Sequence, residues 1–108
     1  MKLGIILQSK NPEHAWNALR LAITARKAEH AVRFFLLNEG VEIQGLSDVD
    51  PFDVATKLNE FTALHGQVSA CGTCLKNRSM QETDACPVAT MTDLLHLVEE
   101  SDKVLVFG

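Results

Sequence analysis

Two cysteines separated by two residues, in the stretch VSACGTCLKNRS, have the residue type and spacing best suited to chemistry in this 108-residue chain. A C-x-x-C pair such as Cys71 and Cys74 can cycle between dithiol and disulfide, supply two ligands to a metal ion, or carry a transferable sulfur atom. A metal site needs further ligands, for which Cys86 and His65 are candidates, but the chain has no second C-x-x-C and no H-x-x-H. A site shared between subunits is a variant of this interpretation, and all three chemistries remain open at this point.

The residues around the pair predict a reactive sulfur. Residues 67–70 read as a short strand, and a helix that starts at Gly72 would leave Cys71 among unpaired N–H groups, which favour the thiolate. On that helix Cys71, Cys74 and Arg78 would share one face, so Arg78 is expected to add a positive charge near the sulfur. The alternative is that both cysteines are simply small buried apolar residues.

His65 and Cys86 are weaker candidates. His65 is expected at a helix end, where capping that helix is a simpler role than assisting a thiolate. Cys86 precedes a proline in a polar segment, and we expect it to be an exposed bystander, with a role as a resolving thiol as the alternative.

The elements that position the cysteines alternate between strand and helix. Apolar strands are expected at residues 2–8, 31–37, 67–70 and 103–107, and helices are expected to begin at Asn11-Pro12, Asp50-Pro51 and Thr90. This order predicts a single α/β domain over residues 1–108, a three-layer αβα sandwich of flavodoxin-like type around a mostly parallel sheet. In such sheets, sites lie beyond the carboxyl ends of the strands, where Cys71 would fall.

Apolar and small residues predict how the helices pack. The first helix is expected to lie close to the sheet on an alanine stripe, and Gly66 is the expected stop of the second helix. The last helix is expected to bury an apolar stripe of its own. The two stripes are Ala15, Ala18, Ala22 and Ala25 in the first helix, and Met91, Leu94, Leu95 and Val98 in the last.

Composition and charge limit the classes of partner. The net charge is −4 and no segment gathers Lys and Arg, so we expect no nucleic-acid partner. The longest apolar runs are strand-sized, and the first residues lack the pattern of a signal peptide, so we expect no membrane span and a cytoplasmic location. In that reducing compartment, paired cysteines are more often catalytic or metal-binding than structural.

Three segments of the chain resemble one known family. KLGIILQ with the alanine-rich helix after it, FFLLNEGVEI, and VSACGTCLKNR with the later TMTDLLHLVEESDKVLVF are similar to parts of the DsrE/DsrF-like family, which includes the TusD-type sulfurtransferases. The cysteine segment is the most specific part. The resemblance implies a DsrE-like α/β sandwich that assembles into homotrimers or hexamers, and a cysteine that carries sulfur as a persulfide between donor and acceptor proteins.

Carried over by position, the sulfur-bearing cysteine of the family falls on Cys71, and Arg78 matches the basic residue that follows it. This chain departs from the pattern because many relay members lack a cysteine at Cys74, Ser79 stands where glycine is common, and Cys86 has no counterpart. The prediction is a sulfur carrier without a cofactor. The alternatives are a thiol–disulfide redox protein that uses Cys71 and Cys74, and a non-catalytic oligomeric subunit that binds a metal.

Overall fold

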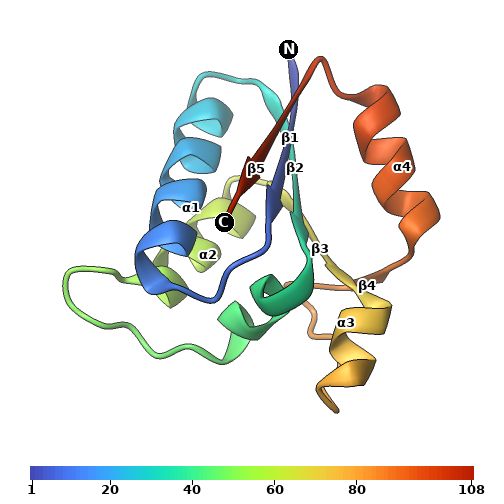
Figure 1. Ribbon diagram of the computed structural model, residues 1–108. Helices are drawn as coiled ribbons and strands as arrows, with labels where there is room; N and C mark the ends of the chain where they lie inside the picture. The colour runs from blue at the N-terminus through green and yellow to red at the C-terminus, as the bar shows by residue number, and fades with distance from the viewer.

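Five parallel strands form one sheet in the computed structural model, which describes residues 1–108 (Figure 1). In space the order is β4-β3-β2-β1-β5, and every neighbouring pair is parallel. The expected α/β fold is confirmed, with β4 as an additional strand too short to be read from the sequence. The strands are β1 (Lys2–Leu7), β2 (Ala31–Leu36), β3 (Gln67–Cys71), β4 (Val88–Ala89) and β5 (Lys103–Phe107).

Helices cover both faces of the sheet. The ring of Phe34 in β2 packs against Phe61 of α2 (Val54–Ala63) with 5.9 Å between centroids, on the same side as α1 (Pro12–Lys27). On the other side, Gly4 of β1 lies so close to α4 (Met91–Glu100) that a Cβ there would collide with Leu97. The 3-10 helix η1 (Asn38–Gly45) and the short helix α3 (Gly72–Asn77) follow β2 and β3 at the carboxyl edge of the sheet (Figure 1). No helix combines the length and the apolar character needed to cross a lipid bilayer.

The first helix folds as the sequence predicts. Asn11 is its N-cap, and the Asn11 side-chain oxygen accepts hydrogen bonds from the backbone N–H groups of Glu13 and His14 at 2.9 and 3.3 Å. The alanine stripe faces the sheet, where side chains of one carbon let the helix axis approach closely. All four of its members are buried: Ala15, Ala18, Ala22 and Ala25.

The ends of α2 differ from the prediction. The helix begins at Val54 instead of Asp50-Pro51, because the carboxylate of Asp48 accepts the backbone N–H of Ala55 at 2.8 Å and so caps the first turn from a distance. At the other end, His65 and not Gly66 has the left-handed conformation, with φ 63°. Gly66 is required for a different reason, since any Cβ there would clash with the ring of Phe61.

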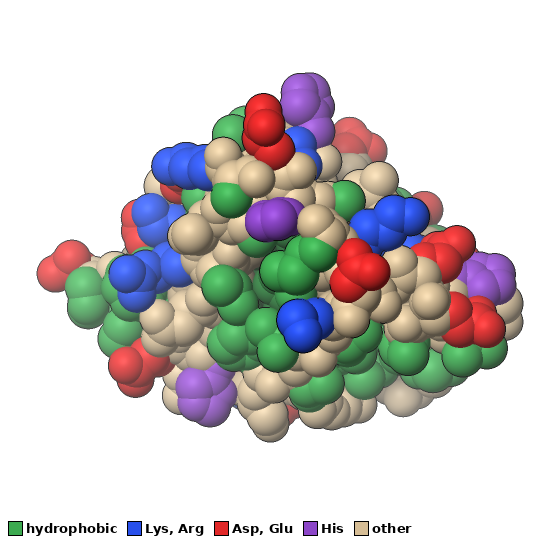
Figure 2. All heavy atoms as spheres, turned by 90° about the horizontal axis from the view of Figure 1, so that it is seen from above, with side chains coloured by type: hydrophobic (Ala, Val, Ile, Leu, Met, Phe, Trp, Pro, Cys, Tyr) green, Lys and Arg blue, Asp and Glu red, His purple; other side chains and the backbone are tan.

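The prediction for α4 is wrong about which face is buried. Leu97 is its only buried residue, 2% exposed, whereas Met91, Leu95 and Val98 are 58%, 54% and 46% exposed. Gly4 leaves room for Leu97 to approach β1, and Leu94 is partly buried against the core, so this orientation turns the other three residues of the stripe away from the sheet. Figure 2 accordingly shows hydrophobic surface on the side of the molecule where α4 lies.

Candidate cysteine site

The cysteine pair lies at the carboxyl edge of the sheet, as expected. Cys71 is the last residue of β3 and also the N-cap of α3, and Cys74 lies in the first turn of that helix. In parallel register, Leu36 of β2 lies beside Ala70, so the segment that follows β2 is carried to the same edge. Two chain segments distant in sequence therefore meet at the pair: α3 and η1.

Both thiol side chains are buried in the single chain. Cys71 is 3% exposed and Cys74 is 8% exposed, which is the burial that the alternative of small apolar residues predicts. Since α3 has only six residues, it aligns few peptide dipoles behind Cys71. Any reaction of this pair with a second protein therefore requires α3 or its neighbours to move.

Cys74 is held in its protonated form. Burial raises the pKa of the Cys74 thiol, and a hydrogen bond with Cys71 that stabilises the protonated form raises this pKa further. The backbone N–H of Asn38, at 3.1 Å from the Cys74 sulfur, and the charge of Arg78 act in the opposite direction and are weaker. The two thiols thus lie close together, and the raised pKa keeps Cys74 protonated near neutral pH.

Arg78 lies at the end of α3, four residues after Cys74, and its charge acts on the Cys74 thiol. Arg78 is the C-cap, and its guanidinium donates from Nε to the carboxylate of Glu42 at 2.9 Å and from Nη1 to the backbone carbonyl of Cys74 at 3.2 Å. Glu42 also lies 4.0 Å from the ammonium of Lys10. The positive charge expected near the sulfur is therefore shared with Glu42, and this ion pair ties α3 to η1.

The environment of Cys86 differs from the exposed position that its polar neighbours in sequence predict. The side chain is fully buried, and burial raises the pKa of its thiol to about 11. The loop containing it folds back against β3, where the backbone N–H of Ala70 donates to the carbonyl of Pro87 at 2.9 Å. The expectation of an exposed bystander is wrong, and Cys86 is a core residue.

The additional ligands considered for a metal site do not assemble in one chain. No three His, Cys, Asp or Glu side chains are grouped as metal ligands are. His65 precedes β3 while Cys71 ends it, so the two lie at opposite ends of this strand, about 17 to 20 Å apart. The same separation prevents His65 from assisting the thiolate. A site shared between subunits stays a prediction.

Two residues of the site were missed by sequence reasoning: Asn38 and Glu42. Both follow β2 directly, in the segment NEGVEI. The signal that could have found them is topological, because residues after one parallel strand lie next to residues after its neighbour. Gly40 makes this approach possible, since a Cβ there would overlap the carbonyl oxygen of Leu7.

A parallel α/β sheet with two thiols close together at its carboxyl edge defines a class of small cysteine-bearing flavodoxin-like domains. The model of the DsrE/DsrF-like family matches residues 1–107. The chain belongs to this family.

Relatives and solved structures agree with that assignment. The chain is 37% identical to the uncharacterised protein MK0008 of Methanopyrus kandleri, over 88% of this chain and 83% of the relative. It is 35% identical to the uncharacterised protein MJ0989 of Methanocaldococcus jannaschii, over 99% of this chain and 100% of the relative. Among crystal structures, the ychN protein from E. coli matches with a TM-score of 0.84 and 27% identity, over 99% of this chain and 100% of that one. The protein BT1422 from Bacteroides thetaiotaomicron, at a TM-score of 0.77 and 18% identity over 97% and 93%, shares the fold.

Proposed function

We propose that this protein is a sulfur carrier, in which Cys71 holds a persulfide and passes its outer sulfur atom to an acceptor protein. The observation that carries the proposal is the close placement of two thiols at the β3–α3 junction of a chain that belongs to the DsrE/DsrF-like family. We place this activity in a reducing compartment such as the cytoplasm, where thiols stay reduced.

Sulfur transfer on Cys71 balances without a cofactor. The Cys71 thiolate attacks the outer sulfur of a donor protein's persulfide, the donor's S–S bond breaks, and the donor leaves as a thiolate. An acceptor thiolate then attacks the outer sulfur on Cys71, and the Cys71 thiolate is regenerated. Because Cys74 keeps its proton, it is a poor nucleophile toward the new persulfide, which favours transfer over loss of the sulfur.

Thiol–disulfide chemistry is the second candidate function, and the same placement of the two thiols favours it. If Cys74 loses its proton, its thiolate attacks the inner sulfur of the Cys71 persulfide, hydrosulfide leaves, and a Cys71–Cys74 disulfide forms. A dithiol reductant must then supply two electrons to restore the pair. The sulfur on Cys71 would in this case be released and not transferred.

Access to the buried pair is expected from beside α3. An open hollow of about 620 Å³ lies against this helix and is lined by Gly72, Leu75, Lys76 and Val88, among others. Gly72 follows Cys71 directly, so a partner that docks in the hollow lies next to the strand–helix junction. We place the donor and the acceptor proteins at this position.

A homotrimer or hexamer is part of the same proposal. Besides the exposed apolar residues of α4, the edge strand β5 carries an exposed apolar side chain, Val106, which is 57% exposed. Exposed apolar groups that adjoin an unpaired strand edge are typical of surfaces that a second copy covers. The fold leaves Met91, Leu95, Val98 and Val106 without a partner in one chain, which supports assembly.

Mass spectrometry with a persulfide donor tests the proposed function. After incubation with glutathione persulfide, we expect one added sulfur atom on the peptide that contains Cys71, and none in Cys71→Ser. Cys86→Ala is the matched control, because Cys86 is buried apart from the pair, and it should keep the adduct. Cys74→Ser should keep the adduct for longer than the unaltered chain. Absence of the adduct, or an equal adduct in Cys71→Ser, would refute the proposal.

A further inference from the structure

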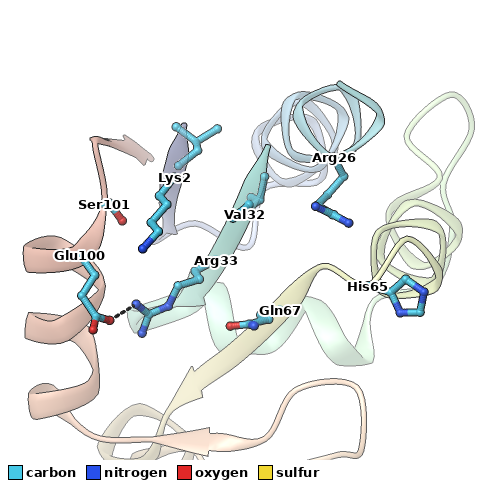
Figure 3. A pocket seen from close by; sticks show the side chains of 10 residues that line it. Lys2, Arg26, Val32, Arg33, His65, Gln67, Glu100 and Ser101 are labelled. Atoms are coloured by element: carbon cyan, nitrogen blue, oxygen red, sulfur yellow. Dashed lines mark hydrogen bonds and ion pairs between the residues drawn. The ribbon is translucent and has the colours of Figure 1, made fainter. Parts of the chain in front are cut away.

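A second cavity lies at the amino edge of the sheet, opposite the cysteine pair. Its volume is about 460 Å³, and its walls come from the first residues of β1, β2 and β3, the last turn of α1, and the end of α4 (Figure 3). The cysteine chemistry uses none of these residues. The apolar part of its lining is formed by Leu3, Ala31 and Val32.

Basic side chains dominate the charged walls of this cavity. Lys2, Arg26 and Arg33 line it together with a single carboxylate, Glu100, so these four groups carry a net charge of +2 in a chain whose net charge is −4. We propose that this cavity is a binding site for a small organic anion that carries a phosphate group or two carboxylates. The inference stands independently of the proposed sulfur chemistry.

Arg26 is the preorganised donor of the site. Its Nε donates to the carbonyl oxygen of Leu64 at 2.9 Å and its Nη1 to that of His30 at 2.8 Å, so the guanidinium is fixed in position. These bonds also satisfy carbonyl groups that follow α2 and α1, which reduces the negative potential that helix C-termini would bring to the cavity. No carboxylate lies within ion-pair distance of Arg26, and its remaining N–H donors are available to an anion.

The side facing α4 supplies the second point of attachment. Lys2 has no carboxylate partner, and Figure 3 shows its side chain extending toward Arg33. Arg33 binds Glu100 at 2.7 Å, but the Glu100 side chain is 61% exposed, so solvent screens this pair. Gln67 lies between Arg33 and His65 and offers a neutral amide donor (Figure 3). Cations on both sides of the apolar residues can bind the acidic groups of a ligand with a short carbon skeleton.

Titration of the protein with two simple anions tests the site. Inorganic phosphate and succinate are added separately while backbone amide NMR signals are recorded, and sodium chloride at matched ionic strength serves as the blank. We expect saturable shifts at the first residues of β1, β2 and β3, and none in α3. Saturation by phosphate identifies a phosphoryl ligand, saturation by succinate identifies a dicarboxylate, and shifts with neither beyond the chloride blank overturn the proposal.

Two surface variants with opposite expected effects keep the test independent of folding. Lys2→Gln removes a cation and should weaken binding about fivefold, whereas Glu100→Gln removes the opposing charge and should tighten binding by a similar factor. Lys76→Gln is the control, because Lys76 also lacks a carboxylate partner but lies on α3 at the other edge. Equal affinities in Lys2→Gln, Glu100→Gln and the unaltered chain would place the anion elsewhere and refute the site.

Discussion

The three thiols of this chain share one residue type but have different surroundings. Cys71 and Cys74 lie close together at a helix start, next to a backbone N–H donor and an arginine. Cys86 has only the hydroxyl of Thr83 as a polar neighbour that lowers its pKa, and burial is the larger effect. Residue type therefore does not decide reactivity here; burial and hydrogen-bond donors do.

Cys86 is expected to be unreactive toward alkylating reagents in the native protein. At pH 8 its thiol stays protonated because burial raises its pKa to about 11, so iodoacetamide should modify Cys86 only after unfolding. The folded-state pKa lies above the unfolded value, so this group favours folding at pH below 9.0, and that contribution declines as the pH rises toward 11. Peptide mapping after alkylation, and urea denaturation between pH 8 and pH 11, measure the two effects.

Cys86→Ala provides the comparison for both measurements. The variant should lose less stability than the unaltered chain as the pH rises above 9.0, since the buried thiol is absent. Modification of native Cys86 at pH 8 as fast as that of a free cysteine would contradict this prediction.

At the residue scale, sequence reasoning found Cys71 and Cys74 but neither Glu42 nor the burial of Cys86. The pair could be found because strand, glycine and helix signals are local to residues 67–77. Glu42 contacts Arg78 across 36 residues, and only the parallel register brings them together. Cys86 was misjudged because its polar neighbours face outward while the loop turns the thiol toward the core.

The element that controls access to the pair is α3. The Glu42–Arg78 ion pair is the charged contact that fastens it to η1, with side chains 32% and 29% exposed. Glu42→Gln should weaken this attachment by about 1 kcal/mol and so increase alkylation of Cys71 and Cys74 roughly fivefold. The alkylation rate is measured at two pH values. Easier opening of α3 raises the rate by the same factor at both pH values, whereas a change in the thiolate fraction raises it by different factors.

Glu39→Gln is the matched control for this prediction. Glu39 belongs to the same 3-10 helix and pairs with Lys10 at 3.8 Å, but it does not contact Arg78. Its alkylation rate should equal that of the unaltered chain. Equal rates in the two variants would show that the ion pair does not restrain α3.

The start of α2 depends on a carboxylate outside the helix, which gives it an acid-sensitive end. Hydrogen bonds from the hydroxyl of Thr56, at 2.6 Å, and from the N–H groups of Ala55 and Thr56 lower the pKa of Asp48. The folded-state pKa is depressed, so this contribution is present above about pH 4 and is lost as the pH falls through the folded value. Asp48→Asn should therefore show a smaller loss of stability between pH 5 and about pH 3 than the unaltered chain.

Thermal unfolding across this pH range measures the effect, and Asp50→Asn is the control because its carboxylate accepts no side-chain hydrogen bond from the helix. A pH profile of Asp48→Asn that coincides with that of the unaltered chain would contradict the capping role of Asp48. This capping also explains why the start of α2 was predicted at the wrong residue. Asp50-Pro51 is a strong local signal for a helix start, but the contact that fixes the first turn joins Asp48 to Ala55, seven residues apart.

At the scale of the whole molecule, the sheet order and the helix layers follow from alternating apolar strands and amphipathic helices, which the sequence displays clearly. The orientation of α4 could not be predicted in this way. An apolar stripe indicates burial, but it does not show whether the sheet or another copy of the chain covers it. Leu97 occupies the space above Gly4 and Leu94 is partly buried against the core, whereas Met91, Leu95 and Val98 are exposed. The exposed residues of the α4 stripe are therefore the surface that the proposed assembly would cover.

A charge placed on this stripe should dissociate the proposed assembly while leaving the fold intact. Leu95 is 54% exposed in the single chain, so Leu95→Glu costs the monomer little, but in an assembly it removes an apolar contact worth about 1.5 to 3 kcal/mol and buries a carboxylate. Sedimentation should show the mass falling toward that of one chain, with the dissociation constant raised at least tenfold. Val49→Glu changes an exposed valine in the loop before α2, 55% exposed, and should leave the mass unchanged because Val49 belongs to neither α4 nor β5. If both variants keep the mass of the unaltered protein, copies of the chain associate through another surface, and the stripe requires a different partner.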